Sequence, residues 1–315
     1  MARYLDPMAD LTFKRIFGEH PHLLKNFLNS VMPFETDRYI IELEYLPHEL
    51  VPDNPGKKLS IVDVRCKDNY GRQFIVEIQT NWYQAFMNRI VFNAGKAFVR
   101  QLDSGENYHL LQPVYTLAIL NENFDHKTDK FYHYYQIVNR ENTDEIIPGL
   151  EFILVELTEK FHPDTIRDRK LMVLWLRFLK EVNEKMDTLP AEMQENEYIR
   201  QAAELCKEGA FTPAELARYD GFWDAVRIEK TIHAEGLEKG EVIGLEKGEA
   251  IGLKKGEAIG LEKGEAIGRA AERAEIQENV VINSHQAGLP VETISSITGL
   301  TPEQVMEILK RHGLI

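Results

Sequence analysis

The chain has 315 residues, of which 43% are hydrophobic and 28% charged, and its formal net charge at pH 7 is −14. This length suits one large or two ordinary domains with a sizeable core, and the composition is that of a soluble globular protein. The negative charge argues against a general nucleic-acid binder. The charge is uneven, however: residues 1–135 carry a net −2 and the remainder −12. An N-terminal part that commits several carboxylates to a metal could still present a cationic groove.

Two further features predict a cytoplasmic protein with no membrane partner. No apolar run reaches the roughly 18 residues that a membrane span needs. The first residues, MARYLDPMADLTFKRIFG, lack the apolar core of a signal peptide. The two cysteines, Cys66 and Cys206, are expected to remain reduced structural thiols.

The N-terminal part of the chain alternates predicted helices and strands. Asp10–Ser30 has apolar residues at helical spacing, with Asp10 placed to cap the first turn and Pro21 to interrupt the helix. The other expected elements are a strand at Arg38–Leu46, a loop at Pro47–Lys58, a hairpin at Leu59–Thr80, a helix at Gln84–Leu102, and strands at Val114–Leu120, Phe131–Val138 and Phe152–Leu157. This order predicts an α/β fold, a mixed sheet flanked by helices, followed by an all-α C-terminal region.

The C-terminal region is expected to be helical from Asp164 onward. Helices are predicted at Arg167–Met186, at Glu192–Lys207 and from Pro213 past His233. From Gly236 four near-identical octads follow, GLEKGEVI, GLEKGEAI, GLKKGEAI and GLEKGEAI, with glycine at every fourth residue as far as Gly268. Each interior glycine costs about 1 kcal/mol relative to alanine. A period of four also departs too far from 3.6 to keep one face against a partner. A solvated, partly helical spacer is therefore the plainer interpretation, and an oligomerisation seam is the alternative.

The tail predicts two short helices that meet at Thr298-Gly299-Leu300. Thr301 is placed to cap the second helix, with Pro302 at its first position. The pair resembles half of a helix-turn-helix, but its cations, Lys310 and Arg311, lie near the end of the second helix, whereas recognition helices usually contact bases from their N-terminal part. A packing or dimerising hairpin is favoured over DNA contact.

The hairpin LSIVDVRCKDNYGRQFIVEIQT carries the candidate chemistry. Asn69 and Gly71 are expected to supply the positive φ angles of the turn. Folding the hairpin about Tyr70 places Asp63 opposite Glu77. Strand alternation then puts Gln79 on the same face as Glu77. Two carboxylates held this close repel each other unless a cation lies between them, so the hairpin predicts a hard-metal site with oxygen ligands.

Five ordered stretches resemble one known family. They are DLTFKRIFG (Asp10–Gly18), YLPHEL (Tyr45–Leu50), LSIVDVRCKDNYGRQFIVEIQ (Leu59–Gln79), NRIVFNAGKAFVRQLDSGENYHLLQPVYTLAIL (Asn88–Leu120) and EFILVELTEKF (Glu151–Phe161). Together with the Glu-Lys-Gly repeats and the ITGLTPEQV ending, they are similar to the Rpn family of recombination-promoting nucleases, also described as transposases, within the PD-(D/E)XK nuclease superfamily. The resemblance covers most of the chain.

The resemblance implies a restriction-endonuclease-like core and metal-dependent hydrolysis of DNA phosphodiester bonds, in recombination or mobile-element biology. It implies Mg²⁺, or another divalent ion such as Mn²⁺ or Ca²⁺, bound by Asp63, Glu77 and the Ile78 carbonyl. Gln79 occupies the lysine position of the motif and cannot supply the lysine's charge. Lys14 is a candidate for the missing cation. Asp10 is a candidate third acidic residue, and a simple helix cap is its alternative role.

Three cations after the hairpin are weaker candidates for contacts with DNA phosphates. Arg89, Lys96 and Arg100 lie on the predicted helix after the hairpin, and the first two are seven residues apart on one face. A solvated helix face is as plausible for each. Trp82 and Tyr83 could stack on a base, but core packing is the commoner role of such residues.

These observations predict a four-part chain with one preferred function. The parts are a nuclease-like core (1–160), a helical region packed on it (161–235), the octad segment (236–268) and a C-terminal helical hairpin (269–315). The preferred function is a divalent-metal-dependent DNA endonuclease. The first alternative is a weak or inactive relative that keeps the fold and binds DNA or assembles. The second is a scaffold that self-associates as a homo-oligomer through residues 213–315.

Overall fold

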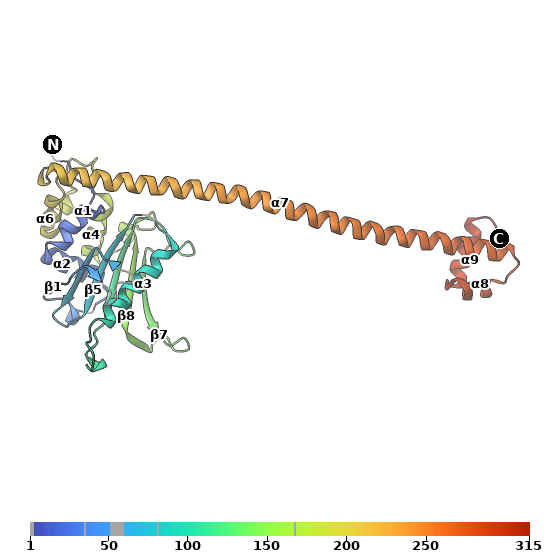
Figure 1. Cartoon of the computed structure of the whole chain (residues 1–315), viewed down its shortest axis with the longest axis horizontal. Helices are drawn as coiled ribbons and strands as arrows, with labels where there is room; N and C mark the ends of the chain where they lie inside the picture. Colours follow the sequence, from blue (N-terminus) through green and yellow to red (C-terminus); the bar gives the residue numbers. More distant parts are fainter. Residues whose placement is uncertain (1–2, 35, 51–59, 81, 167) are drawn as a thin grey trace. The chain divides into compact units, whose positions relative to one another are not determined.

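A computed structural model of the chain describes residues 3–34, 36–50, 60–80, 82–166 and 168–315. It forms two compact units, Met1–Ile232 and His233–Ile315 (Figure 1). Among the described residues, no helix is both long and apolar enough to cross a membrane. Residues 51–58 of the predicted loop Pro47–Lys58 lie outside the described residues, as does Leu59, the first residue of the predicted hairpin. Within the described part of that loop, Glu49–Leu50 forms a short strand instead.

The first unit is built on a six-stranded mixed sheet with the order β1-β4-β5-β6-β8-β7. The strands are β1 (Leu43–Tyr45), β4 (Val64–Asp68), β5 (Gln73–Gln79), β6 (Val114–Leu120), β7 (Tyr132–Val138) and β8 (Ile146–Glu156). β5, β6 and β8 run parallel, whereas β1, β4 and β7 pair antiparallel with their neighbours. A separate two-stranded ladder joins β2 (Glu49–Leu50) to β3 (Ser60–Ile61). The predicted α/β fold with a mixed sheet is thereby confirmed.

Helices cover both faces of the sheet (Figure 1). One face packs against α1 (Asp10–Phe13), the π-helix η1 (Lys14–Gly18), α2 (Pro21–Val31), α4 (Lys170–Glu181), α5 (Ala191–Glu195) and α6 (Glu197–Leu205). Phe17, Phe27 and Trp175 form the aromatic centre of this larger core, with ring centroids 4.8 to 5.5 Å apart. The other face packs against α3 (Gln84–Val99) through buried Phe86, Ile90 and Ala94.

The alternation along the parallel strands decides which side chains reach α3. Ala118 of β6 and Leu154 of β8 align with Glu77 of β5 and pack in the cluster of α3, so Glu77 points toward this helix. Val76 and Leu117, one position earlier, belong to the larger core on the opposite face. At this level of the sheet β5 therefore presents a carboxylate among apolar residues beneath α3.

Helices α7 (Pro213–Gln286), α8 (Val291–Thr298) and α9 (Pro302–Arg311) complete the chain. The octads lie within α7, and their side chains are exposed. In the second unit, buried Val281, Ile294, Val305 and Leu309 form a small core. Gly299 ends α8 with a left-handed φ of 70°, and Thr301 and Gln304 form a capping box at the start of α9. The predicted meeting point and cap of these two helices are confirmed.

Candidate active site

The β4–β5 hairpin brings the two predicted carboxylates together. The ladder pairs Val64 with Val76, and one step further this register sets Asp63 level with Glu77. At the turn, Asp68 and Arg72 form a buried ion pair with Nη2 and Oδ2 2.6 Å apart. Among the described residues only glycines have positive φ, and here it is Gly71 at 78°. The expectation of positive φ at Asn69 was wrong. Its side-chain oxygen accepts a hydrogen bond from the backbone N–H of Ile41 at 3.0 Å.

Asp63 lies just before β4 and is tied to the neighbouring strand. Its Oδ2 accepts a hydrogen bond from the Ile78 backbone N–H at 2.8 Å. Burial raises the pKa of Asp63 to about 6, the Ile78 N–H opposes that rise, and the nearby charge of Glu77 adds to it. The carboxylate therefore stands in a setting where a further positive charge would be favourable.

Glu77 is buried on β5 beneath α3. Its Oε1 accepts from Nδ2 of Asn93 at 3.0 Å, and its Oε2 lies 3.2 Å from Nη2 of Arg89. Burial raises the pKa of Glu77, while Arg89 and Asn93 oppose the rise. Glu77 is thus a desolvated carboxylate that is held in place by two side chains of the covering helix.

Asp10 and Lys14 face the same region from the N-terminal helix. Their side chains form an ion pair with Nζ and Oδ1 2.7 Å apart. The charge of Asp10 raises the pKa of Asp63 and that of Lys14 lowers it, so both lie within electrostatic reach of that carboxylate. The expectation that Asp10 caps the helix was wrong: Ala9 is the N-cap, without a side-chain cap, and Asp10 is the first helical residue.

The three cations expected to contact phosphates are engaged with the protein itself. Arg89 bonds to Gln79 Oε1 at 3.0 Å and to the Tyr83 hydroxyl at 2.9 Å, in addition to Glu77. Lys96 donates to the backbone carbonyl of Leu50 at 2.9 Å. Burial lowers the pKa of Arg65, and the nearby positive charge of Arg100 lowers it further.

The comparison with protein families decides what kind of fold surrounds these residues. Residues 7–227 match the family described as PD-(D/E)XK nuclease family transposase, which is more than half of the chain. The chain belongs to this family. No curated protein and no solved structure matched the sequence significantly. The match agrees with the predicted superfamily and with the mixed sheet flanked by helices.

Asn93 is a residue of this candidate site that sequence reasoning missed. It is fully buried on the face of α3 that covers the sheet, one turn after Arg89. Its Oδ1 has no hydrogen-bond partner among the described residues. The available signal was a polar residue inside the apolar stripe of the helix, next to Ile90, Ala94 and Ala97.

PD-(D/E)XK nucleases generally use divalent metal ions, and the donor set here is compatible with one. Asp63 and Glu77 are hard oxygen donors whose pKa values are both raised by burial, and a cation would offset that cost. The Ile78 carbonyl is the third predicted ligand. No group of three or more His, Cys, Asp or Glu side chains within the described part of the chain is arranged to hold a metal. The predicted ligand set contains only two such side chains, together with a backbone carbonyl.

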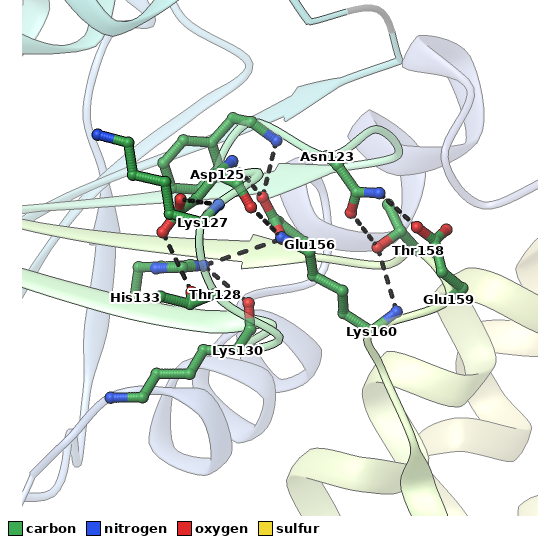
Figure 2. Close-up of polar contacts among 11 residues, drawn as sticks. Asn123, Asp125, Lys127, Thr128, Lys130, His133, Glu156, Thr158, Glu159 and Lys160 are labelled. Carbon is green, nitrogen blue, oxygen red and sulfur yellow. Dashed lines mark hydrogen bonds and ion pairs between the residues drawn. The ribbon is translucent and has the colours of Figure 1, made fainter.

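A second buried carboxylate, Glu156 of β8, lies at the same end of the parallel strands, aligned through Leu120 with Gln79 of β5. Figure 2 shows the polar contacts around it. Its Oε1 accepts from the backbone N–H groups of Phe124 and Asp125 at 2.7 and 3.0 Å. Its Oε2 forms an ion pair with Lys160 at 2.8 Å, and Lys160 also donates to the Asp125 carbonyl. Glu156 thus has a cation and two amides as partners, and the two amides tie it to the loop after β6.

Proposed function

We propose that the protein is a divalent-metal-dependent DNA endonuclease that acts in recombination or in the movement of mobile elements. The observation that carries this proposal is the Asp63–Glu77 pair, which lies at the end of β5 in a chain of the PD-(D/E)XK nuclease family. A DNA substrate is consistent with the cytoplasmic location proposed from the sequence.

Asp63, Glu77 and the carbonyl of Ile78 are the residues that would hold the ion. Asp63 has one oxygen engaged by the Ile78 N–H, which fixes its carboxylate and leaves the other oxygen for this role. When bound, a divalent ion lowers the pKa of a coordinated water and neutralises charge at the phosphate. The amide of Gln79 can orient such a water through its carbonyl and N–H groups, and Lys14 and Asp10 lie on the Asp63 side of the site.

The experiment is a nicking assay on supercoiled plasmid. We expect wild-type protein to nick the plasmid with Mg²⁺ or Mn²⁺ and not with EDTA, and Asp63→Ala to lose the activity by about 100-fold or more. Asp144→Ala is the matched control, because Asp144 is an exposed acid in the turn between β7 and β8. Metal-dependent nicking that survives in Asp63→Ala would refute the site.

A catalytically weak DNA-binding or assembly protein is the second candidate function. The observation that favours it is the neutral Gln79 at the lysine position, bonded to Arg89. This candidate predicts that wild-type protein retards DNA in a gel but does not nick it with any of Mg²⁺, Mn²⁺ or Ca²⁺.

The four-part division and the homo-oligomer are further proposals. The exposed apolar side chains of the octads, Leu245, Ile251 and Leu253 among them, support a self-association role for this segment. The oligomeric state of the chain ended before Gly236, measured by light scattering, tests the seam: an unchanged oligomer would exclude the repeat from it.

A further inference from the structure

Gln79 stands at the lysine position of the motif but carries no positive charge, because an amide is neutral. The family's motif, PD-(D/E)XK, places a lysine after the acidic residue of β5. In this structure a guanidinium lies against that position: Nη2 of Arg89 donates to Oε1 of Gln79 at 3.0 Å. The charge is thus present at the site, but it comes from α3 rather than from β5.

The same nitrogen also holds Glu77. Nη2 of Arg89 lies 3.2 Å from Oε2 of Glu77, while Asn93 holds the other carboxylate oxygen. Burial disfavours the ionised form of Glu77, and the charge of Arg89 opposes this effect more than any other group does. Arg89 is therefore the counter-ion of a buried carboxylate and occupies one of its two oxygens.

The surroundings of Arg89 fix its guanidinium and leave one side of it open. Nη1 donates to the Tyr83 hydroxyl at 2.9 Å, and the guanidinium carbon lies 4.8 Å from the ring centre of Phe86. The side chain is nonetheless 40% exposed. A guanidinium has five N–H donors, so Arg89 can keep these contacts and still meet an anion on its exposed side.

We propose that Arg89 is the cation of this active site, in place of the motif lysine, and that it competes with a divalent metal ion for Oε2 of Glu77. This inference rests on the proposed nuclease function. In the metal-free chain Arg89 neutralises Glu77. With a metal ion bound, Arg89 would keep its contacts with Gln79 and Tyr83 and would supply positive charge for a DNA phosphate.

The first test measures metal binding without any DNA. The affinity for Mn²⁺, followed by electron paramagnetic resonance of the free ion, is compared in wild type, Arg89→Gln, Arg89→Lys and the control Arg140→Gln. Arg140 is exposed in the turn between β7 and β8. Because the competing cation is removed, we expect Arg89→Gln to bind Mn²⁺ about 3- to 10-fold more tightly, in the range of partly exposed ion pairs. Arg140→Gln should match wild type.

The second test measures plasmid nicking at saturating Mn²⁺. Arg89→Gln should nick roughly 100-fold more slowly in spite of its tighter metal binding, because it lacks the charge at the phosphate. Arg89→Lys should recover part of the rate and bind Mn²⁺ with intermediate affinity. A purely structural role would not move the two readouts in opposite directions.

The following results would overturn the proposed roles of Arg89. Unchanged or weaker Mn²⁺ binding by Arg89→Gln overturns the competition, and a normal nicking rate overturns the charge role. If Arg89→Gln does not fold, Arg89→Lys decides both points in the same directions. If wild type nicks no DNA, the proposed function fails and the Mn²⁺ affinities alone judge Arg89.

Discussion

Asn93 donates from a fully buried position to Oε1 of Glu77. A charged side chain at position 93 would therefore lie directly beside that carboxylate. Asn93→Asp would put a second carboxylate beside Glu77. We expect the free energy of unfolding in EDTA to fall by about 1–3 kcal/mol, because two buried like charges are brought together. Added Mg²⁺ should raise the melting temperature more in this variant than in wild type. The exposed Asn142→Asp is the control. Equal responses to Mg²⁺ in the variant and wild type would argue against a cation at Glu77.

Asp6 predicts a pH dependence of stability that is separate from the active site. Burial raises its pKa to about 6 from 3.8, although its Oδ1 accepts the Met8 N–H at 2.7 Å. An acid with a raised folded-state pKa contributes stability that is fully present below its unfolded pKa and is lost as the pH rises through its folded pKa.

From pH 4 to 7 the Asp6 contribution should therefore fall, by at most about 3 kcal/mol. Asp6→Asn should flatten that part of the stability curve, as measured by urea unfolding at several pH values. If the variant keeps the full wild-type slope, Asp6 is not its source.

At this scale the sequence predicts residues within one hairpin better than contacts between elements. Asp63 and Glu77 were predicted to be level because strand alternation and a tight turn fix the register locally. The contacts of Arg89 and Asn93 with β5 depend on how α3 crosses the sheet, which local periodicity does not specify. Lys14, on the helix before the hairpin, was a candidate for the missing cation; in the structure it pairs with Asp10, whereas Arg89 bonds to Gln79.

At the scale of single elements, α3 contains a glycine that its packing does not require. A Cβ added at Gly95 would meet nothing within 4 Å. Gly95→Ala should therefore stabilise the first unit by about 0.5–1 kcal/mol, through helix propensity alone. Thermal unfolding followed by circular dichroism measures this change, and plasmid nicking should stay at the wild-type rate.

Gly299→Ala should change stability in the opposite direction. Its space is equally open, but its φ of 70° is unfavourable for alanine, so the substitution should destabilise the second unit. A stabilising effect at Gly299 would mean that local space, and not backbone conformation, governs both positions.

Strand ends were predicted less well than strand identity, for reasons that involve particular side chains. β1 begins at Leu43 and not at Arg38, because the backbone N–H groups of Ile40 and Ile41 are taken by the side chains of Asn29 and Asn69. β8 begins at Ile146, ahead of the predicted Phe152, because Ile146 and Ile147 also pair with β7, beyond an irregularity in the ladder that contains Pro148 and Gly149. Val114–Leu120, wholly buried, was predicted with its observed bounds.

At the scale of the whole molecule, the first unit ends at Ile232, inside α7. The start of α7 belongs to its fold: the Tyr219 hydroxyl accepts from the Asp6 N–H at 2.9 Å, and Tyr219 packs with Leu5 and Phe211. We expect a chain ended at Ile232 to unfold in one cooperative transition and to keep its metal-dependent nicking.

A chain ended at Ala210 loses Tyr219 and Phe211 and should melt at a lower temperature. Differential scanning calorimetry of both chains makes the comparison. If the longer fragment does not fold, the proposed independence of the N-terminal unit is wrong.

The octads show the limit of sequence reasoning at this scale. Nine glycines led to the expectation of a partly helical segment, yet the structure carries one helix through all of them. No Cβ added at these glycines would meet another atom within 4 Å, so no close packing within the described residues requires them. Propensity could predict a weak helix there but not its continuity from Pro213 to Gln286.

The hold of Glu156 on the loop after β6 has a consequence for the exchange of backbone hydrogens with solvent. Phe124 and Asp125 lie outside any strand, yet both of their amides donate to this fully buried carboxylate. Local fluctuation of the loop exposes these amides only when it breaks their hydrogen bonds to Glu156, a carboxylate that Lys160 also holds. In deuterated water these two loop amides should exchange nearly as slowly as the strand amides of β6, and much faster in Glu156→Gln. The loop after β6, at the same end of the sheet as Gln79, would then exchange its hydrogens like a strand rather than like a mobile loop.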